Sequence, residues 1–349
     1  MNAKLPSRWY FDDDILKLEQ ARVFAPGPQY VGHELMVPNR GDYHTLDWAD
    51  HGLALVHNDQ GVELVTNVCR HRQATMLHGR GNAKAIVCPL HKWSYDLEGK
   101  QLGAPHFGEK PCLDLFKDSL TSWNGLLFRG QAPDIPAWGK GSLMDMSRYR
   151  FDRSVTNSCD QNWKSFIEVY LDLYHVTPAH PGLGKFVSTE FTWEYGSNYS
   201  LQKVGIRDLQ NPGTPAWKAY HDQVKAKVPH RPFGALWMLI FPNIMVEWYP
   251  GAMMISTVLP QTPQRTLNVV EFYYPPEMDQ EFVEIQQAAY LETAVEDEDL
   301  GRRMDLGRKT ILSRGRDDLG PVHIPMEEGI IQFHDYLIDS IEKACTTGH

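Results

Sequence analysis

The chain has 349 residues, of which 42% are hydrophobic and 22% are charged, a composition typical of a folded protein with about two domains. Its 44 acidic and 34 basic residues give a net charge of −10, which argues against nucleic acid or an anionic membrane surface as a partner. No apolar run approaches the roughly 18 residues of a membrane span, and the N-terminus lacks the apolar core of a secretory signal. Five irregularly spaced cysteines do not suggest a disulfide framework, so a cytoplasmic location is expected.

The first third of the chain divides into a short helix and a small β module. Acidic residues followed by an apolar stripe at three- and four-residue spacing predict a helix over 8–24. We expect residues 1–28 to pack on the domain that follows the β module. Short apolar runs between Gly-, Asn- and Asp-rich turns predict an all-β domain over 29–132. Prolines and glycines in 131–144 indicate a linker.

The remaining residues, 145–349, mix helical and strand periods. Helices are expected at 160–176, 277–312 and 327–344, and strands at 201–207, 235–247, 252–259 and 266–274. Strands followed by long helices predict an α+β domain in which one sheet curls around a helix.

Two short segments of the β module each offer one cysteine and one histidine. Cys69 and His71 form the first pair, and Cys88 and His91 form the second. Buried cysteines beside surface histidines are one interpretation. A structural zinc site is another, although zinc fingers usually pair like ligands within one segment. A Rieske 2Fe–2S cluster is the third interpretation, because two cysteines then bind one iron and two histidines the other, so that each loop contacts both irons.

The run CPLHKWSYDLEG, from Cys88 to Gly99, resembles the second cluster loop of the Rieske oxygenases. Lys92 departs from that loop, in which glycine is commoner at this position. The resemblance covers nearly the whole chain and implies an N-terminal Rieske β module followed by a helix-grip catalytic domain with a central antiparallel sheet. It also implies four ligands of the 2Fe–2S cluster: Cys69, His71, Cys88 and His91.

A second group of metal-binding residue types lies in the following domain. On one helix Glu168, Asp172 and His175 would share a face, and Pro178 would break the helix so that His180 turns back. A solvated helix face with ordinary histidines is the plain alternative. The pattern D-x-x-H-x-x-x-x-H, preceded by Asn-Trp-Lys, resembles the mononuclear iron segment of the same family.

Two histidines need one carboxylate to complete the facial triad that holds Fe(II) with open positions for dioxygen. The candidates lie in one late acidic segment: Glu292, Glu296, Asp297, Glu298 and Asp299. In the family the third ligand is the Asp of a Glu-Asp pair with a glycine further on, here Gly307. The resemblance therefore implies His175, His180 and Asp297 as iron ligands, with Asp299 as the alternative.

The resemblance gives Asp172 a different role. In the family this carboxylate bonds an iron-ligating histidine of its own chain, here His175, and the exposed cluster histidine of a neighbouring chain, here His91. It thus implies a head-to-tail ring, usually a trimer, with electron transfer between subunits. The electrons would come from NAD(P)H through a flavin and iron–sulfur reductase, with or without a ferredoxin, and the chain has no G-x-G-x-x-G loop of its own.

These features predict the terminal oxygenase of a multicomponent system, which uses O2 to hydroxylate or demethylate a small organic substrate. An aromatic or heteroaromatic compound is expected because it is the commoner class in the family, and Arg207, Lys218 or Arg231 would hold an aromatic acid. The alternative is a quaternary ammonium compound held by Glu168 and by aromatic residues of the stretch 233–254. Two rival classes are an electron-transfer protein without catalysis and a zinc-stabilised ligand-binding protein.

Overall fold

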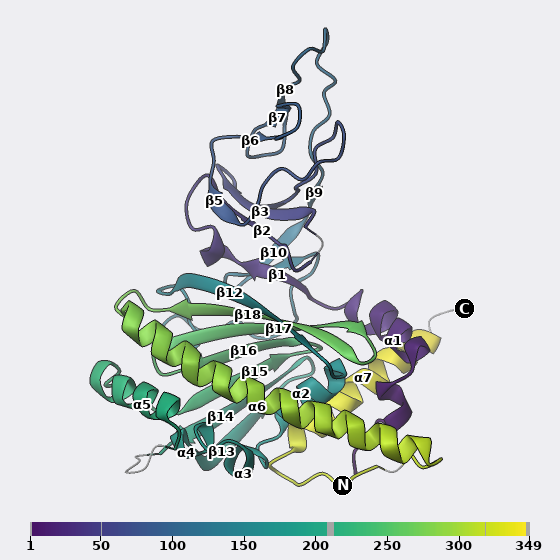
Figure 1. The fold of residues 1–349 in the computed structure, drawn as a ribbon, viewed down its shortest axis with the longest axis vertical. Helices are drawn as coiled ribbons and strands as arrows, with labels where there is room; N and C mark the ends of the chain where they lie inside the picture. Colours follow the sequence, from purple (N-terminus) through teal and green to yellow (C-terminus); the bar gives the residue numbers. More distant parts are fainter. Residues whose placement is uncertain (1, 50, 208–212, 318, 347–349) are drawn as a thin grey trace. The chain divides into compact units, whose positions relative to one another are not determined.

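The structure is a computed structural model that describes residues 2–49, 51–207, 213–317 and 319–346, the last four of these by their backbone alone. The chain forms two compact units, Pro28–Pro133 and the combination of Met1–Gly27 with Asp134–His349. Figure 1 shows the smaller unit built from strands and the larger one from a broad sheet with helices. Within the described ranges no helix is both long and apolar enough to cross a membrane.

The smaller unit is all β, as its alternating runs and turns predict. Its largest sheet has five antiparallel strands in the order β5-β2-β3-β4-β9, and two three-stranded sheets accompany it, β1-β11-β10 and β6-β7-β8. Ala54, Val56 and Val65 form a core together with Cys69 and Cys88. The strands are β1 Gln29–His33, β2 Asp42–Thr45, β3 Leu53–Asn58, β4 Gly61–Thr66, β5 Arg80–Asn82, β6 Ile86–Val87, β7 Ser94–Tyr95, β8 Gln101–Gly103, β9 Lys117–Asp118, β10 Leu120–Trp123 and β11 Leu126–Arg129.

The larger unit contains one antiparallel sheet of seven strands in the order β12-β18-β17-β16-β15-β14-β13. The predicted strand over 235–247 is two strands, β15 and β16, because the chain turns at Pro242. Strands β12 and β13 were not predicted. The bounds are β12 Arg150–Cys159, β13 Val187–Tyr195, β14 Tyr199–Ile206, β15 Ala235–Ile240, β16 Ile244–Tyr249, β17 Ala252–Thr262 and β18 Arg265–Tyr274.

The long helix α6 lies along this sheet, and α2 and α5 pack against α6 (Figure 1). Side chains that accept backbone N–H bonds fix the helix starts: Asp279 caps α6 and Asn162 caps α2. The N-terminal segment contributes Leu5, Tyr10 and Val23 to the core of this larger unit. The helices are η1 Ser7–Tyr10, α1 Asp13–Glu19, η2 Gln20–Phe24, η3 Glu34–Met36, α2 Trp163–Leu171, α3 Val176–Ala179, α4 Leu183–Phe186, α5 Pro215–Lys227, α6 Gln280–Ser313 and α7 Glu328–Thr346.

The helix expected over 160–176 ends earlier than predicted. Helix α2 stops at Leu171, and Asp172 takes an extended backbone conformation with φ −95° and ψ 109°. The Asp172 carboxylate then accepts hydrogen bonds from the backbone N–H groups of Tyr174 (2.6 Å) and His175 (3.2 Å), so it caps the following turn. Glu168 and His175 consequently do not share a helix face, which corrects the argument from helical spacing.

One face of the seven-stranded sheet carries a polar seam between two apolar clusters. Trp237, Tyr249 and Met254 belong to one cluster, and Leu239 and Met245 belong to the other. Alternate side chains of a strand point to the same face, so the residues between these positions face the same space. Those residues are polar: Glu247 on β16, Ser256 on β17 and Asn268 on β18. Buried polar residues in an apolar sheet face indicate a binding site there.

Candidate active site

The two Cys–His segments of the smaller unit form matching tight loops. The Gln73 N–H donates to the Cys69 carbonyl, and the Lys92 N–H donates to the Cys88 carbonyl, both at 3.1 Å. Gln73 and Lys92 each have φ of 59°, a left-handed conformation that favours glycine. The two loops therefore share the same turn after the cysteine, although His71 follows Cys69 by two residues and His91 follows Cys88 by three. The glycine expected at position 92 suits this backbone better than the lysine present.

The four predicted cluster ligands form a donor set that fits a Rieske cluster. Cys69 and Cys88 are buried, and the rings of His71 and His91 lie 4.7 Å apart between centroids. The Nδ1 atom of His71 is buried without a hydrogen-bond partner among the described residues, as an atom that binds a metal would be. The Tyr95 hydroxyl lies 3.6 Å from Cys69 Sγ, within hydrogen-bonding distance of the sulfur, and burial raises the pKa of Tyr95 to about 12.

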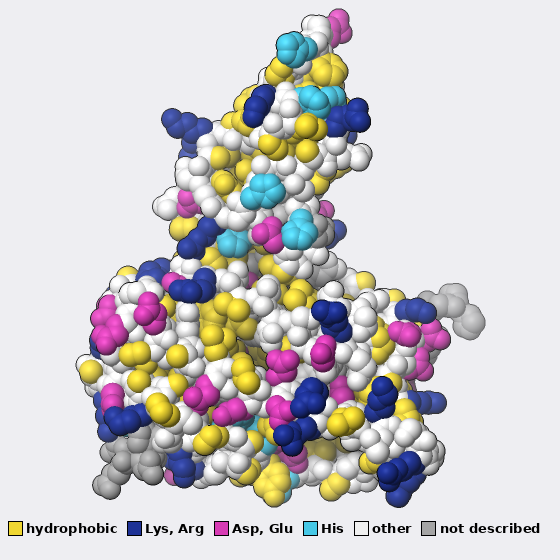
Figure 2. Space-filling model, viewed as in Figure 1, with side chains coloured by type: hydrophobic (Ala, Val, Ile, Leu, Met, Phe, Trp, Pro, Cys, Tyr) yellow, Lys and Arg dark blue, Asp and Glu magenta, His cyan; other side chains and the backbone are white. Residues whose placement is uncertain are grey.

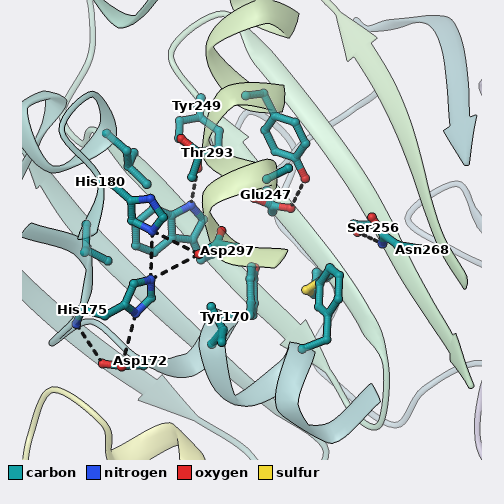
Figure 3. A pocket seen from close by; sticks show the side chains of 18 of the residues that line it. Tyr170, Asp172, His175, His180, Glu247, Tyr249, Ser256, Asn268, Thr293 and Asp297 are labelled. Carbon is teal, nitrogen blue, oxygen red and sulfur yellow. Dashed lines mark hydrogen bonds and ion pairs between the residues drawn. The ribbon is translucent and has the colours of Figure 1, made fainter. Parts of the chain in front are cut away.

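In the larger unit His175, His180 and Asp297 point toward one another (Figure 3). The two histidines flank the one-turn helix α3, which brings their Nε2 atoms within 2.9 Å. Asp297 Oδ1, from α6, lies 3.3 Å from His175 Nε2 and 3.1 Å from His180 Nε2. Among the described residues this is the one group of three or more Cys, His, Asp or Glu whose ligand atoms all lie within 4.8 Å of one another, close enough to bind a single metal ion. Two imidazoles and a carboxylate fit the facial triad of a non-haem iron.

Carboxylates behind the two histidines orient their rings. Glu296 Oε2 lies 2.7 Å from His180 Nδ1, and Asp172 Oδ2 lies 3.3 Å from His175 Nδ1. Burial lowers the pKa of His175, but the neighbouring carboxylates of Asp172 and Asp297 outweigh this and raise the pKa to about 9. Such outer carboxylates direct the other ring nitrogen toward a metal and raise its basicity.

Asp299, the alternative third ligand, lies away from the triad. Its carboxylate pairs with Arg302 at 2.6 Å and Arg303 at 2.5 Å, and its side chain is 42% exposed. These hydrogen bonds lower its pKa. Asp299 is therefore part of the exposed acidic helix surface that was expected for most residues of this segment.

A cavity adjoins the triad and reaches the polar seam of the sheet. Its aromatic lining consists of Phe166, Tyr170, Trp217, Trp237, Tyr249 and Tyr290. Glu247 is the acid of the seam, and it accepts a hydrogen bond from the Tyr290 hydroxyl at 2.8 Å (Figure 3). Burial raises the pKa of Glu247 to about 8. Glu247 was not predicted from the sequence, although a single acidic residue inside the apolar run of β16 indicates a polar function.

Glu168 does not line this cavity, which overturns the hypothesis that it binds a cationic substrate. Its buried carboxylate bonds Tyr10, Arg308 and His334, the last at 2.8 Å. Burial raises the pKa of Glu168, but Arg308 and His334 outweigh this and lower it to about 2. The glutamate therefore ties the N-terminal segment to α2, α6 and α7 instead of facing the site.

The residues expected to hold an aromatic acid are also absent from the lining. Arg207, Lys218 and Arg231 do not border the cavity, and no lysine or arginine occurs among the described residues that do. From the stretch 233–254 only Trp237, Met245, Glu247 and Tyr249 line it, since alternate residues face the other side of the sheet.

Fold and site together define an oxygenase with a Rieske cluster and a mononuclear iron. The chain matches the Rieske [2Fe-2S] domain over residues 27–117 and the ring hydroxylating alpha subunit catalytic domain over residues 146–343, and it belongs to this family of Rieske oxygenase alpha subunits. It is therefore an enzyme that uses both metal centres and receives electrons from a reductase. This excludes the two rival classes, the non-catalytic electron carrier and the zinc-stabilised binding protein.

Among similar proteins, the putrescine 2-hydroxylase of Ralstonia nicotianae is 51% identical over 95% of this chain and 94% of its own length. The carnitine monooxygenase oxygenase subunit of Escherichia coli is 25% identical over 95% of this chain and 92% of its own length. A crystal structure of a quaternary ammonium Rieske monooxygenase in complex with L-carnitine has the same fold, with a TM-score of 0.74 at 19% identity over 97% of this chain and 95% of that chain.

Proposed function

We propose that this oxygenase hydroxylates a carbon of a small aliphatic amine, and that putrescine is the substrate to test first. The observation that carries the proposal is Glu247, a buried acid in the cavity next to the triad. The relative named putrescine 2-hydroxylase, similar along nearly its whole length, supports the same substrate class. The expectation of an aromatic substrate receives no support from the relatives reported above.

A buried carboxylate selects for a cation. A charged amine enters an apolar cavity only if a partner offsets its loss of hydration, and Glu247 would supply that partner. Tyr290 occupies one oxygen of the carboxylate, and the other makes no hydrogen bond among the described residues. Faces of Trp237 and Tyr249 would add cation–π attraction. The negative charge of Glu247 would instead repel an aromatic carboxylate.

His175, His180 and Asp297 would hold the iron, and bound iron supplies the activation of dioxygen that C–H hydroxylation requires. The residues around it fix the substrate and exclude water. In the net reaction a C–H bond, O2, two electrons and two protons give C–OH and water, and NAD(P)H provides the electrons through the reductase. Cys69, His71, Cys88 and His91 would hold the cluster that relays them.

Asp172 would connect the two centres of neighbouring subunits. Its carboxylate contacts His175 on one side, and its side chain is 20% exposed, so a second group can reach it. His91 is exposed on the smaller unit and would be that group in a head-to-tail ring, usually a trimer. Electrons would then pass from the cluster of one subunit through His91 to Asp172 and His175 of the adjacent subunit.

A quaternary ammonium compound is the second candidate, because the aromatic lining also suits a trimethylammonium group and the carnitine monooxygenase subunit is a relative. A primary ammonium, however, donates hydrogen bonds that Glu247 can accept, and a quaternary one does not.

Turnover with a reductase, NAD(P)H and 18O2 separates these possibilities. We expect one labelled oxygen atom in putrescine and faster turnover of putrescine than of carnitine or benzoate. Labelled product from benzoate, with none from any amine, would refute the proposal.

A further inference from the structure

The polar seam continues beyond Glu247 as a hydrogen-bonded serine and asparagine, the Ser256–Asn268 pair. Asn268 Nδ2 donates to Ser256 Oγ at 2.7 Å, and both side chains line the cavity. Ser256 is 1% exposed and Asn268 is 6% exposed, so the pair is buried in the sheet face. In Figure 3 it lies on the other side of Glu247 from His175 and His180.

The sheet does not need this pair to hold its strands together. Strands β17 and β18 are joined by their backbones along this stretch, where Ser256 is opposite Val270 and Asn268 is opposite Val258. Both valines are buried, so apolar side chains suit this part of the sheet face. Polar side chains in such a place cost free energy unless all of their hydrogen-bonding atoms find partners.

The asparagine amide has one atom left for a ligand. Its nitrogen donates to the Thr257 carbonyl at 3.3 Å as well as to Ser256, and a carbonyl only accepts, so the nitrogen must face that side. Asn268 Oδ1 accepts no hydrogen bond among the described residues. Ser256 Oγ also keeps a lone pair beyond the one that the amide uses. The pair therefore offers hydrogen-bond acceptors to the cavity.

Strand register gives the separation between the pair and the acid. Met254 on β17 is directly opposite Glu247 on β16, and Ser256 lies two residues further along β17. Glu247 and Ser256 are thus diagonal neighbours on one sheet face, about 7–8 Å apart. The two nitrogens of an extended four-carbon diamine are roughly 6 Å apart from standard bond lengths. A diamine along this diagonal can place one nitrogen at the acid and the other at the pair.

We infer that Ser256 and Asn268 are specificity-determining residues that accept hydrogen bonds from the second amine of a diamine whose first amine binds Glu247. This inference rests on the proposed function and adds the requirement for two nitrogens. Neutral oxygen acceptors suit an N–H donor at this place. A monoamine would leave Asn268 Oδ1 unpaired, and a carboxylate in the same place would face oxygen lone pairs.

The test compares putrescine with two analogues of similar length. Butylamine lacks the second nitrogen, and 4-aminobutyrate has a carboxylate at that end. In the wild type we expect kcat/KM for putrescine to exceed that for butylamine by about 10- to 100-fold, because a site built to bond a polar group rejects the analogue that lacks it. We expect 4-aminobutyrate to react more slowly than butylamine. Asn268→Leu and Ser256→Ala should each lower kcat/KM for putrescine, together by about that factor, and change butylamine little.

Asn243→Leu is the matched control. Asn243 is another buried asparagine of the same unit, its amide donates to the Val258 carbonyl at 2.8 Å, and it does not line the cavity. Any effect of this change should lower kcat/KM for putrescine and butylamine equally. Thermal unfolding gives a measurement without turnover: at equal concentration putrescine should raise the Tm of the wild type more than butylamine does, and Asn268→Leu should remove this difference.

Three results would overturn the inference while leaving amine hydroxylation intact. They are equal kcat/KM for putrescine and butylamine in the wild type, an unchanged ratio in the double variant of Ser256→Ala and Asn268→Leu, and equal losses for both amines in that variant. Absence of turnover with every amine in the wild type would instead refute the proposed function and this inference with it.

Discussion

Replacing Glu247 with glutamine tests the carboxylate on which amine recognition depends. Glutamine keeps the size of the side chain and an oxygen that can accept the Tyr290 hydrogen bond, now 2.8 Å long. It removes only the negative charge. The change therefore isolates the electrostatic part of recognition from the shape of the cavity.

The expected loss follows from the burial of Glu247, which is 5% exposed. Removing one partner of a buried charge pair costs about 2–5 kcal/mol, and each 1.4 kcal/mol is a factor of ten. At pH 9 we expect kcat/KM for putrescine to fall by roughly 30- to 4,000-fold in Glu247→Gln. At pH 7 the difference should be about tenfold smaller, because a carboxyl with a pKa near 8 is then only about a tenth ionised.

The wild type should accordingly show a pH-dependent kcat/KM. Burial raises the pKa of Glu247 to about 8, so the empty site holds a proton that the cationic substrate must displace. Binding should improve as the pH rises from 6 to 8 and level off above, whereas the Glu247→Gln profile should lack this limb. The substrate ammonium stays protonated up to about pH 10, as a lysine does.

Glu271→Gln is the matched control. Glu271 is another buried glutamate that accepts a hydrogen bond from a tyrosine hydroxyl, that of Tyr273 at 2.6 Å, and it does not line the cavity.

The pH dependence of folding stability gives a further check on Glu247. Between pH 4.5 and 8 the folded state binds a proton at Glu247 that the unfolded state releases, so stability falls as the pH rises. Glu247→Gln should therefore melt at a higher temperature at pH 9. Unchanged kcat/KM for putrescine in Glu247→Gln would refute the proposal that the Glu247 carboxylate binds the amine.

Three further predictions concern other parts of the chain. Asp172→Asn should retain iron and a reducible cluster but lose about 10- to 100-fold in single-turnover product formation, because Asp172 orients His175; full activity would contradict its role. Glu168→Ala should lower the free energy of unfolding by about 3–5 kcal/mol in urea titrations, because it removes the carboxylate nearest to Arg308 and the buried partner of Tyr10 and His334. It should leave the turnover of putrescine relative to carnitine unchanged. Lys92→Gly should stabilise the smaller unit by about 1 kcal/mol, measured by thermal loss of cluster absorbance, because it relieves a φ of 59°; a lower midpoint would argue against strain there.

Local chemistry explains why part of the site was predictable. Cys69, His71, Cys88 and His91 lie in two short segments, and their residue types restrict the metals they suit. His175 and His180 are equally close in sequence. Asp297 lies far along the chain on α6, and only the family resemblance suggested it, because spacing within one sequence does not reveal which helix meets which loop.

Substrate recognition was not predictable for reasons of tertiary structure. The helix was expected to continue past Leu171, but α2 ends there because Asp172 caps the next turn. Glu168 therefore does not share a face with His175, and the predicted role of Glu168 in binding a cationic substrate was wrong. Glu247 stands in a strand whose residues are all buried, so sequence alone could not tell which alternate set faces the cavity.

Basic and acidic side chains are interspersed over the larger unit on the face seen in Figure 2, and no basic patch gathers there. This agrees with the net charge of −10 in giving no reason to expect a polyanionic partner.

Iron and acid-labile sulfide analysis of anaerobically purified wild type and His175→Ala tests the central claim most directly. The wild type should contain about three irons and two sulfides per chain, and the variant about two irons and two sulfides, with the cluster spectrum intact and no oxygen incorporated into any substrate. Equal iron content in the two proteins, or undiminished hydroxylation by the variant, would contradict an oxygenase that joins a Rieske cluster to a separate iron held by His175.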